Sequence, residues 1–139
     1  MKFTREYLVR YAHCDFAGIV FFPQYFVLLN DHVEDWFAEL GADFARLHGP
    51  MGLAVPTVRL ETDFDRPSRI GDRLTISHEI ERLGTSSVTL RREARCGDES
   101  RVRVRQTLVC MAQSSARPQP WPESLRENMQ HYLAEETPT

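Results

Sequence analysis

Cysteine is scarce in this sequence, with three residues in 139, at positions 14, 96 and 110. Three scattered thiols supply neither a disulfide framework nor the four ligands of a structural zinc site, and an odd count is typical of a reducing compartment. No stretch approaches the ~20 apolar residues that span a bilayer, and the N-terminal run MKFTREYLVR lacks the apolar core of a signal peptide. These absences predict a cytoplasmic protein with no metal, no cofactor and no membrane partner.

An excess of charge of one sign is also missing. The net charge is −3, with 17 basic and 20 acidic residues, so the surface offers no general attraction to a phosphate backbone. Nucleic acid is therefore not expected as a partner. Hydrophobic residues make up 42% of the chain and charged residues 27%, which is an ordinary globular balance. A chain of this length predicts one domain that buries roughly 68–70% of its unfolded surface.

One apolar helix is predicted between Pro23 and Leu40. Its apolar residues recur at spacings of three and four, the period of a helix that buries a wide face: Tyr25, Phe26, Leu28, Leu29, Val33, Trp36, Phe37 and Leu40. Pro23 suits the first helical position, and Gly41 suits the residue just past the end. The free N–H groups of the first turn, with the positive end of the helix macrodipole, would face residues 13–18.

Asp15 lies just ahead of this helix and is the leading candidate for chemistry. The small pair Ala17-Gly18 lets the chain bend closely over the helix start. A carboxylate beside N–H groups aimed at a carbonyl oxygen has the parts needed to hydrolyse an activated acyl group, by nucleophilic or general-base chemistry. An aspartate before a helix is more often a turn or capping residue, so spacing alone leaves both interpretations open.

The run from Tyr11 to Tyr25, YAHCDFAGIVFFPQY, resembles the signature of hotdog-fold acyl-CoA thioesterases, most closely the 4-hydroxybenzoyl-CoA thioesterase family of the pseudomonad type. A second piece, FDRPSRIGDRLTI at 64–76, is similar to that family's strand, turn and hairpin, so the resemblance spans about residues 3 to 112. It implies hydrolysis of an acyl-CoA to free acid and CoA. Carried over residue by residue, the catalytic carboxylate falls on Asp15 and the carbonyl-polarising backbone N–H on Phe22.

The resemblance also implies the fold: α+β, a hotdog arrangement in which a five-stranded antiparallel sheet wraps around one long central helix. The sequence pattern agrees, with extended stretches at 3–12, 53–64, 72–83, 85–96 and 100–113, where Pro56 makes the start of the second an edge or loop. The residues facing the helix would be Leu74, Ile76, Ile80, Val88, Leu90, Ala94, Val102, Val104 and Leu108. We expect the hotdog domain at 1–114, and a Pro-rich linker with a short helix at 123–133 in the tail 115–139.

Substrate contacts are expected around the helix start and along the helix, from Gly18, Val20, Phe21, Tyr25 and Asn30. The aromatic side chains crowd the acyl end and favour an aromatic or other compact acyl group. Relatives hold the CoA phosphates with basic residues at the turn that this chain replaces with Gly84-Thr85-Ser86-Ser87. The CoA-binding candidates are therefore Arg82, Ser86, Ser87 and Arg91, and acyl carrier protein stays open as the carrier.

Other functions and sites remain open from the sequence. Asp31 and Glu34 compete with Asp15, because another branch of hotdog thioesterases carries its essential carboxylate on the helix. His13 beside Asp15 is the only pair offered for a hydratase or dehydratase, and a non-catalytic acyl-CoA-binding protein is the remaining alternative. The unpaired sheet edge further predicts a homodimer, or a homotetramer built as a dimer of dimers.

Two groups of polar residues are expected to be structural. The alternating Arg101, Arg103 and Arg105 are predicted to pair with glutamates on a solvated sheet face and not to hold phosphate. His78 is expected as a hydrogen-bonded inward residue, whereas the other histidines outside the site, His32, His48 and His131, are expected at the polar surface.

Overall fold

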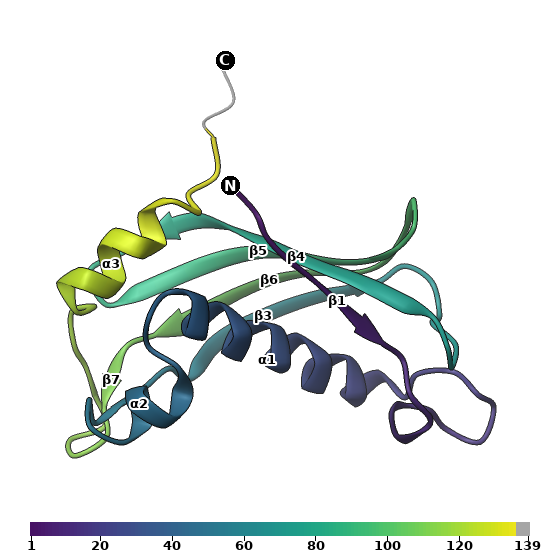
Figure 1. The fold of residues 1–139 in the computed structure, drawn as a ribbon, viewed down its shortest axis with the longest axis horizontal. Helices are drawn as coiled ribbons and strands as arrows, with labels where there is room; N and C mark the ends of the chain where they lie inside the picture. Colours follow the sequence, from purple (N-terminus) through teal and green to yellow (C-terminus); the bar gives the residue numbers. More distant parts are fainter. Residues whose placement is uncertain (136–139) are drawn as a thin grey trace.

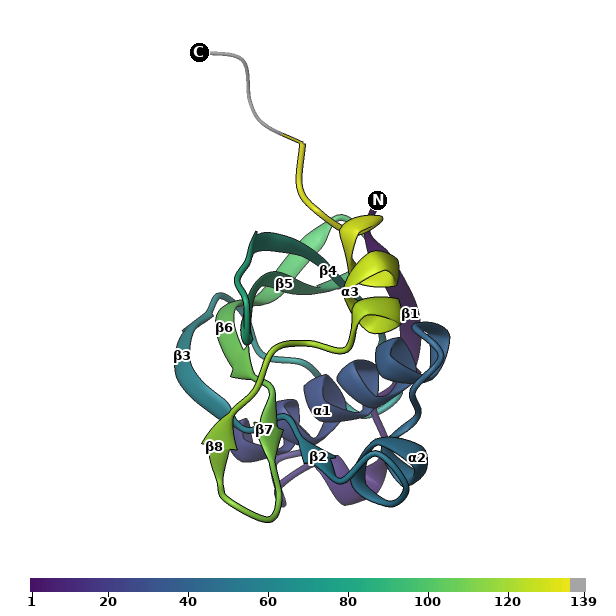
Figure 2. The same ribbon diagram turned by 90° about the vertical axis from the view of Figure 1, so that its left-hand side faces the viewer.

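The computed structural model describes residues 1–135 and contains one five-stranded antiparallel sheet that curves around a long helix (Figure 1). The strand order is β1-β4-β5-β6-β3. The strands are β1 (Phe3–Leu8), β4 (Arg73–Leu83), β5 (Ser87–Cys96), β6 (Glu99–Val109) and β3 (Thr57–Phe64). The helix α1 (Phe22–Glu39) lies across the concave face, as both views show (Figures 1 and 2).

The ends of α1 follow from its terminal residues. Phe21 is the N-cap in an extended conformation, and Pro23 occupies the first turn, where its missing N–H costs nothing. At the other end the Gly41 N–H donates to the Ala38 carbonyl (3.1 Å) and the Ala42 N–H to the Phe37 carbonyl (2.9 Å). This pattern is a Schellman motif, and it needs the left-handed conformation that Gly41 adopts at φ +94°.

The core fills the space between α1 and the sheet. All nine strand residues predicted to face the helix are at most 5% exposed, and Trp36 and Phe37 of α1 are fully buried. The predicted hotdog arrangement with a five-stranded antiparallel sheet is therefore confirmed. The description with one long helix is incomplete, because a second helix of eight residues, α3 (Glu123–Gln130), also joins the core.

The C-terminal segment packs on the same core as α1. A small sheet joins β2 (Leu53–Ala54), β7 (Met111–Ala112) and β8 (Arg117–Pro118), so part of the predicted linker is a strand. Beyond β8, four buried side chains belong to the cluster that contains Trp36: Trp121, Leu125, Met129 and Tyr132. The predicted terminal helix stops at Gln130, and residues 136–139 of the predicted tail lie outside the described residues.

The first strand ends earlier than expected. It stops at Leu8, and a 3₁₀ turn, η1 (Tyr11–His13), follows it. The chain around Pro56 is a break between β2 and β3, as expected for a residue without an N–H. The short helix α2 (Phe44–His48) begins after Asp43, whose side chain accepts from the Arg46 N–H at 2.8 Å.

Within residues 1–135, no helix combines the length and apolar character needed to cross a membrane.

Truncating Leu125 tests whether α3 is part of the core. Leu125 is 2% exposed, so Leu125→Ala should lower the free energy of unfolding by about 2–5 kcal/mol through lost burial and a residual cavity. Glu127→Ala, an exposed position on the same helix, should change it by about 0.5 kcal/mol or less. Urea unfolding of both variants makes the comparison, and equal effects would contradict the packing of α3.

Candidate active site

The loop before α1 is a tight hairpin closed by backbone hydrogen bonds. The Asp15 N–H donates to the Ile19 carbonyl (2.9 Å), and the Gly18 N–H donates to the Asp15 carbonyl (3.0 Å). The Phe21 N–H then donates to the His13 carbonyl (3.0 Å). Gly18 takes φ +76°, a left-handed conformation that glycine adopts without steric cost. The hairpin therefore fixes Asp15 within the loop that leads into α1.

The carboxylate of Asp15 takes part in this turn and keeps one oxygen free. The side chain is half-buried, and Oδ1 accepts from the Ala17 N–H at 2.9 Å, which is an Asx-turn contact. Oδ2 has no hydrogen-bond partner among residues 1–135. A carboxylate can accept through both oxygens, so the turn role leaves room for a substrate or a water at Oδ2.

The first turn of α1 presents one unused backbone N–H, that of Phe22. Pro23 has no N–H, and the Gln24 N–H donates to the Phe21 carbonyl at 2.8 Å. The Phe22 N–H is the first of the helix, so it has no intrahelical acceptor, and it makes no other hydrogen bond within the described residues. With the macrodipole behind it, this group can stabilise negative charge on a carbonyl oxygen.

A cleft of about 470 Å³ runs along α1 from this turn. The wall on the helix is formed by Pro23, Phe26, Val27, Leu29 and Asn30, and the wall on the sheet by Thr57, Leu60, Arg92 and Gln106. A second hollow of about 240 Å³ shares Asn30, Thr57 and Gln106 and continues towards His48. The volume of the cleft is in the range of small-molecule sites.

Comparison with known proteins identifies the family of this chain. Residues 9–129 match the thioesterase-like superfamily. The chain belongs to this superfamily. A 1,4-dihydroxy-2-naphthoyl-CoA hydrolase from Synechococcus elongatus (strain ATCC 33912 / PCC 7942 / FACHB-805) is 29% identical over 126 residues, covering 88% of this chain and 91% of the relative. The hydrolase of the same name from Thermosynechococcus vestitus is 34% identical over 82 residues, which are 59% of this chain and 56% of that relative.

Solved structures share the fold of this thioesterase-family chain. A 1,4-dihydroxy-2-naphthoyl-CoA thioesterase from Synechocystis superposes with a TM-score of 0.85 at 23% identity, covering 94% of this chain and 96% of the other. A Staphylococcus aureus protein in complex with CoA gives a TM-score of 0.89 at 17% identity, with 100% and 90% covered. The expectation of an acyl-CoA thioesterase of the hotdog class is confirmed at the level of family and enzyme class.

The substrate-binding candidates of this thioesterase lie in two settings. Gly18 is in the hairpin, Phe21 is 51% exposed beside the free N–H, and Asn30 is exposed on the wall of the cleft. Val20 and Tyr25 are buried, at 7% and 5% exposure. The Tyr25 hydroxyl accepts from the Ser68 N–H at 3.1 Å, so it anchors the loop between β3 and β4 behind the site.

The CoA-binding candidates lie far from Asp15 within one chain. Arg82, Ser86 and Ser87 flank the turn between β4 and β5, which the C-terminal segment covers: Arg126 donates to the Gly84 carbonyl (2.7 Å) and the Trp121 indole to the Ser87 carbonyl (3.0 Å). Figure 1 shows α3 and the loop before α1 at opposite ends of the helix. The fourth candidate, Arg91, is exposed and pairs with Glu79 at 2.9 Å. One chain therefore does not bring these four residues to the catalytic candidates.

The rival acids have their own contacts. Glu34 accepts from the Asn30 amide at 3.2 Å. Burial and then the neighbouring Asp35 raise the pKa of Asp31 above its usual value, while His13 opposes the shift. His13 Nδ1 accepts from the Arg10 N–H at 2.9 Å, and within the described residues it makes no hydrogen bond to Asp15. The acid–histidine pair that a hydratase needs is therefore not formed.

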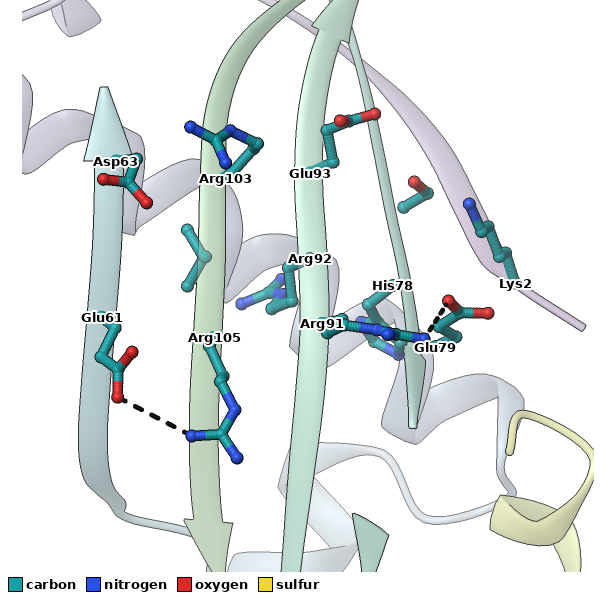
Figure 3. A pocket seen from close by; sticks show the side chains of 12 residues that line it. Lys2, Glu61, Asp63, His78, Glu79, Arg91, Arg92, Glu93, Arg103 and Arg105 are labelled. Carbon is teal, nitrogen blue, oxygen red and sulfur yellow. Dashed lines mark hydrogen bonds and ion pairs between the residues drawn. The ribbon is translucent and has the colours of Figure 1, made fainter. Parts of the chain in front are cut away.

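A separate hollow of about 370 Å³ lies on the outer face of the sheet, away from α1 (Figure 3). Its charged lining residues are Lys2, Glu61, Asp63, Glu79, Arg91, Arg92, Glu93, Arg103 and Arg105, of which Arg92 is buried and also lines the cleft beside α1. Many of these charges are paired across strands, and Arg105 also contacts Glu81 at 2.7 Å, which confirms the predicted arginine–glutamate pairing at that position. The sheet separates this hollow from Asp15, so the two do not form one site.

The sequence interpretation missed a buried polar cluster under α1. His32 is fully buried, so its predicted place at the surface is wrong. Its position four residues from both Leu28 and Trp36, on the apolar stripe of the helix, was the available signal. Arg92 is also buried, and the alternation of β5 between Leu90 and Ala94 places it on the inner face. His78 is inward as predicted, but neither ring nitrogen has a hydrogen-bond partner in the described structure.

The two buried histidines make stability depend on pH. Burial, followed by the charge of Arg92, lowers the pKa of His32 to about 3 and holds the pKa of His78 well below its usual 6.5. Unfolding restores ordinary values, so from pH 6.5 down to about 3 the unfolded chain binds more protons than the folded one. Stability must therefore fall as the pH falls through this window.

Replacing His78 tests that account. His78→Met removes one titrating group and two unpaired ring nitrogens, so the loss of unfolding free energy between pH 7 and pH 5 should shrink, with stability at pH 7 near or above wild type. The exposed His131→Gln serves as the control and should keep the wild-type slope. Urea unfolding at the two pH values measures both, and an unchanged slope in His78→Met would refute the assignment.

Proposed function

We propose that this protein hydrolyses an aromatic acyl-CoA thioester to the free acid and CoA, with Asp15 as the reacting carboxylate and the Phe22 N–H polarising the carbonyl. One observation carries the proposal. A carboxylate with a free oxygen lies in the short hairpin that leads to an unused helix-start N–H, and the cleft begins at the next residue, Pro23. This is the pairing that acyl transfer needs.

Two chemical routes use these groups. In the nucleophilic route, an Asp15 oxygen attacks the thioester carbon, the C–S bond breaks, CoA leaves as the thiolate, and water hydrolyses the resulting anhydride. In the general-base route, Asp15 takes a proton from a water whose oxygen attacks the same carbon, and the proton passes to the leaving thiolate. In both, the tetrahedral oxyanion is stabilised by the Phe22 N–H and the helix dipole.

The acyl group is proposed to be aromatic because of the walls of the cleft and the relatives. Phe26 of the cleft wall packs against Phe64, with ring centroids 6.3 Å apart, and Phe64 packs against Phe22 at 6.2 Å, so aromatic side chains adjoin the cleft. The relatives named 1,4-dihydroxy-2-naphthoyl-CoA hydrolase act on a two-ring aromatic acyl group. Rings of this kind stack on aromatic side chains at such spacings.

A second copy of the chain is proposed to complete the site. β3 is an edge strand, and its apolar residues Val58, Leu60 and Phe64 are 61%, 43% and 49% exposed. An unpaired, apolar edge is a template for pairing with the same edge of another copy. Such a homodimer, alone or doubled into a homotetramer, would close the cleft beside β3. It would also let Arg82, Ser86, Ser87 or Arg91 of another subunit approach the CoA phosphates.

Removing the charge of Asp15 is the direct test of the chemistry. Asp15→Asn keeps the size and the turn hydrogen bond, so the melting temperature should stay near wild type, while kcat falls on the order of 10²-fold or more. Thiol release from benzoyl-, naphthoyl- and straight-chain acyl-CoAs measures it. Asp31→Asn and Glu34→Gln are the matched controls and should keep kcat within a few-fold. A wild-type kcat in Asp15→Asn would overturn the mechanism, and tight binding without turnover by the wild-type protein would favour a non-catalytic acyl-CoA-binding role.

Placing a charge on the β3 edge tests the assembly. Leu60→Asp should shift the protein towards monomer at micromolar concentration, because a carboxylate on the paired edge must be desolvated. Thr4→Asp, an exposed position on the other edge strand β1, should leave the oligomer intact. Light scattering reports both masses, and a monomeric wild-type protein would rule the dimer out.

A further inference from the structure

Arg92 is a buried cation in the wall of the cleft that the proposed chemistry does not use. Its side chain comes from β5 beside the outward Arg91 (Figure 3), and it is 4% exposed. Burial lowers the pKa of Arg92 to about 9, so the guanidinium is still charged at neutral pH. None of the ion pairs among residues 1–135 involves it, so no described carboxylate oxygen lies within 4.0 Å of its nitrogens. A buried charge without a counter-ion is costly to a fold.

The hydrogen-bond partners of Arg92 are neutral and leave some of its N–H donors unused. Nη1 donates to Gln106 Oε1 (2.6 Å), and Nη2 contacts the Leu29 carbonyl (2.6 Å) and His32 Nδ1 (2.9 Å). His32 Nε2 lies 3.1 Å from the Phe3 carbonyl, which fixes Nδ1 as the acceptor. Nε has no partner in the described structure. A guanidinium carries five N–H donors. Three are used and Nε is shielded from solvent, so the second N–H of Nη1 remains for another acceptor.

The position of Arg92 matches the far end of a bound acyl group. Arg92 and Gln106 line the same cleft as Pro23, whose neighbour Phe22 carries the free N–H. Leu29, whose carbonyl holds Arg92, lies about 10 Å along the helix axis from Phe22 at 1.5 Å per residue. An aromatic acyl group with its carbonyl at Phe22 would therefore point its opposite end at this pair.

We propose that Arg92, oriented by Gln106, binds an anionic oxygen at the end of the acyl group opposite the thioester. The substrate class is then an aromatic acyl-CoA that carries a carboxylate at its far end. This inference rests on the proposed hydrolysis at Asp15 and names the acyl group that the site selects. The bound anion supplies the counter-ion that the chain lacks, and charge-assisted hydrogen bonds to a guanidinium are the strongest such contacts available.

A purely structural role gives different expectations. In that case Arg92 only ties the Leu29 carbonyl of α1 to the sheet, and its replacement lowers stability and all activities together. Discrimination between acyl groups that differ only at the far end would then not depend on Arg92 or on Gln106. The ratio of activities is therefore the deciding quantity.

The test compares three para-substituted substrates of similar size: 4-methylbenzoyl-CoA, 4-hydroxybenzoyl-CoA and 4-carboxybenzoyl-CoA. For the wild-type protein, kcat/KM should rise in that order and be about 10-fold or more higher for the carboxylate than for the methyl compound, the usual effect of a hydrogen bond to a charged group. Dissociation constants of the same three compounds for Asp15→Asn, measured by calorimetry, should follow the same order without requiring turnover.

Two variants test whether Arg92 carries the preference. Gln106→Glu is nearly isosteric and places a carboxylate where Gln106 Oε1 lies 2.6 Å from Nη1. It should therefore abolish or reverse the preference, measured as the ratio of kcat/KM for 4-carboxybenzoyl-CoA to kcat/KM for 4-methylbenzoyl-CoA. Arg92→Met should bring the ratio close to one. If Arg92→Met does not fold, Gln106→Glu still gives the answer.

The outcomes separate this inference from the proposed function. Hydrolysis of all three compounds at similar rates, or a preference that survives Gln106→Glu, would overturn the role of Arg92 and leave the thioesterase in place. Absence of hydrolysis by the wild-type protein would remove the proposed function. In that case the calorimetric series still decides whether Arg92 selects an anionic acyl group, and equal dissociation constants would reject it.

Discussion

The burial of the apolar face of α1 against the concave sheet is the interaction on which the rest of the structure depends. The helix carries Trp36 and Phe37 into full burial, and neither the helix nor the sheet could hide these surfaces alone. Fixing α1 also fixes its first turn, and the hairpin that contains Asp15 is tied to that turn by the hydrogen bond from Phe21 to His13. The placement of the candidate site is therefore a consequence of core packing.

The same packing produces the buried polar cluster. An arginine and two histidines lie between α1 and the sheet, where each must be neutral or hydrogen-bonded to be tolerated. His32 meets that condition through the Phe3 carbonyl and Arg92, whereas His78 packs against Trp36 with ring centroids 4.4 Å apart and no hydrogen bond in the described structure. Polar groups retained at such cost commonly serve binding, so the cleft wall that contains Arg92 is a candidate determinant of specificity.

As a third consequence of the fold, different parts of α1 form different parts of the candidate site. The start of the helix presents the free Phe22 N–H, its middle forms a wall of the cleft, and its end is capped and packs against α2 and α3. The turn between β4 and β5 lies at that far end. In the proposed homodimer, the turn of one subunit would approach the CoA of a substrate bound at Asp15 of another, which links the proposed chemistry to the proposed assembly.

The sequence by itself determined the long helix, the five strands and their inward faces, because hydrophobic periodicity records which side of each element is buried. The Asp15 turn could also be located from the sequence, because the backbone conformations that Asp15, Gly18 and Pro23 favour depend on residues close to them in the chain. Only the tertiary structure decided which polar residues share a space. Arg92, His32 and Gln106 come from three separate elements, and the packing of Trp121 and Leu125 on Trp36 joins the tail to the core across long stretches of chain. No local pattern encodes such contacts, because their energies depend on burial and on partners distant in sequence.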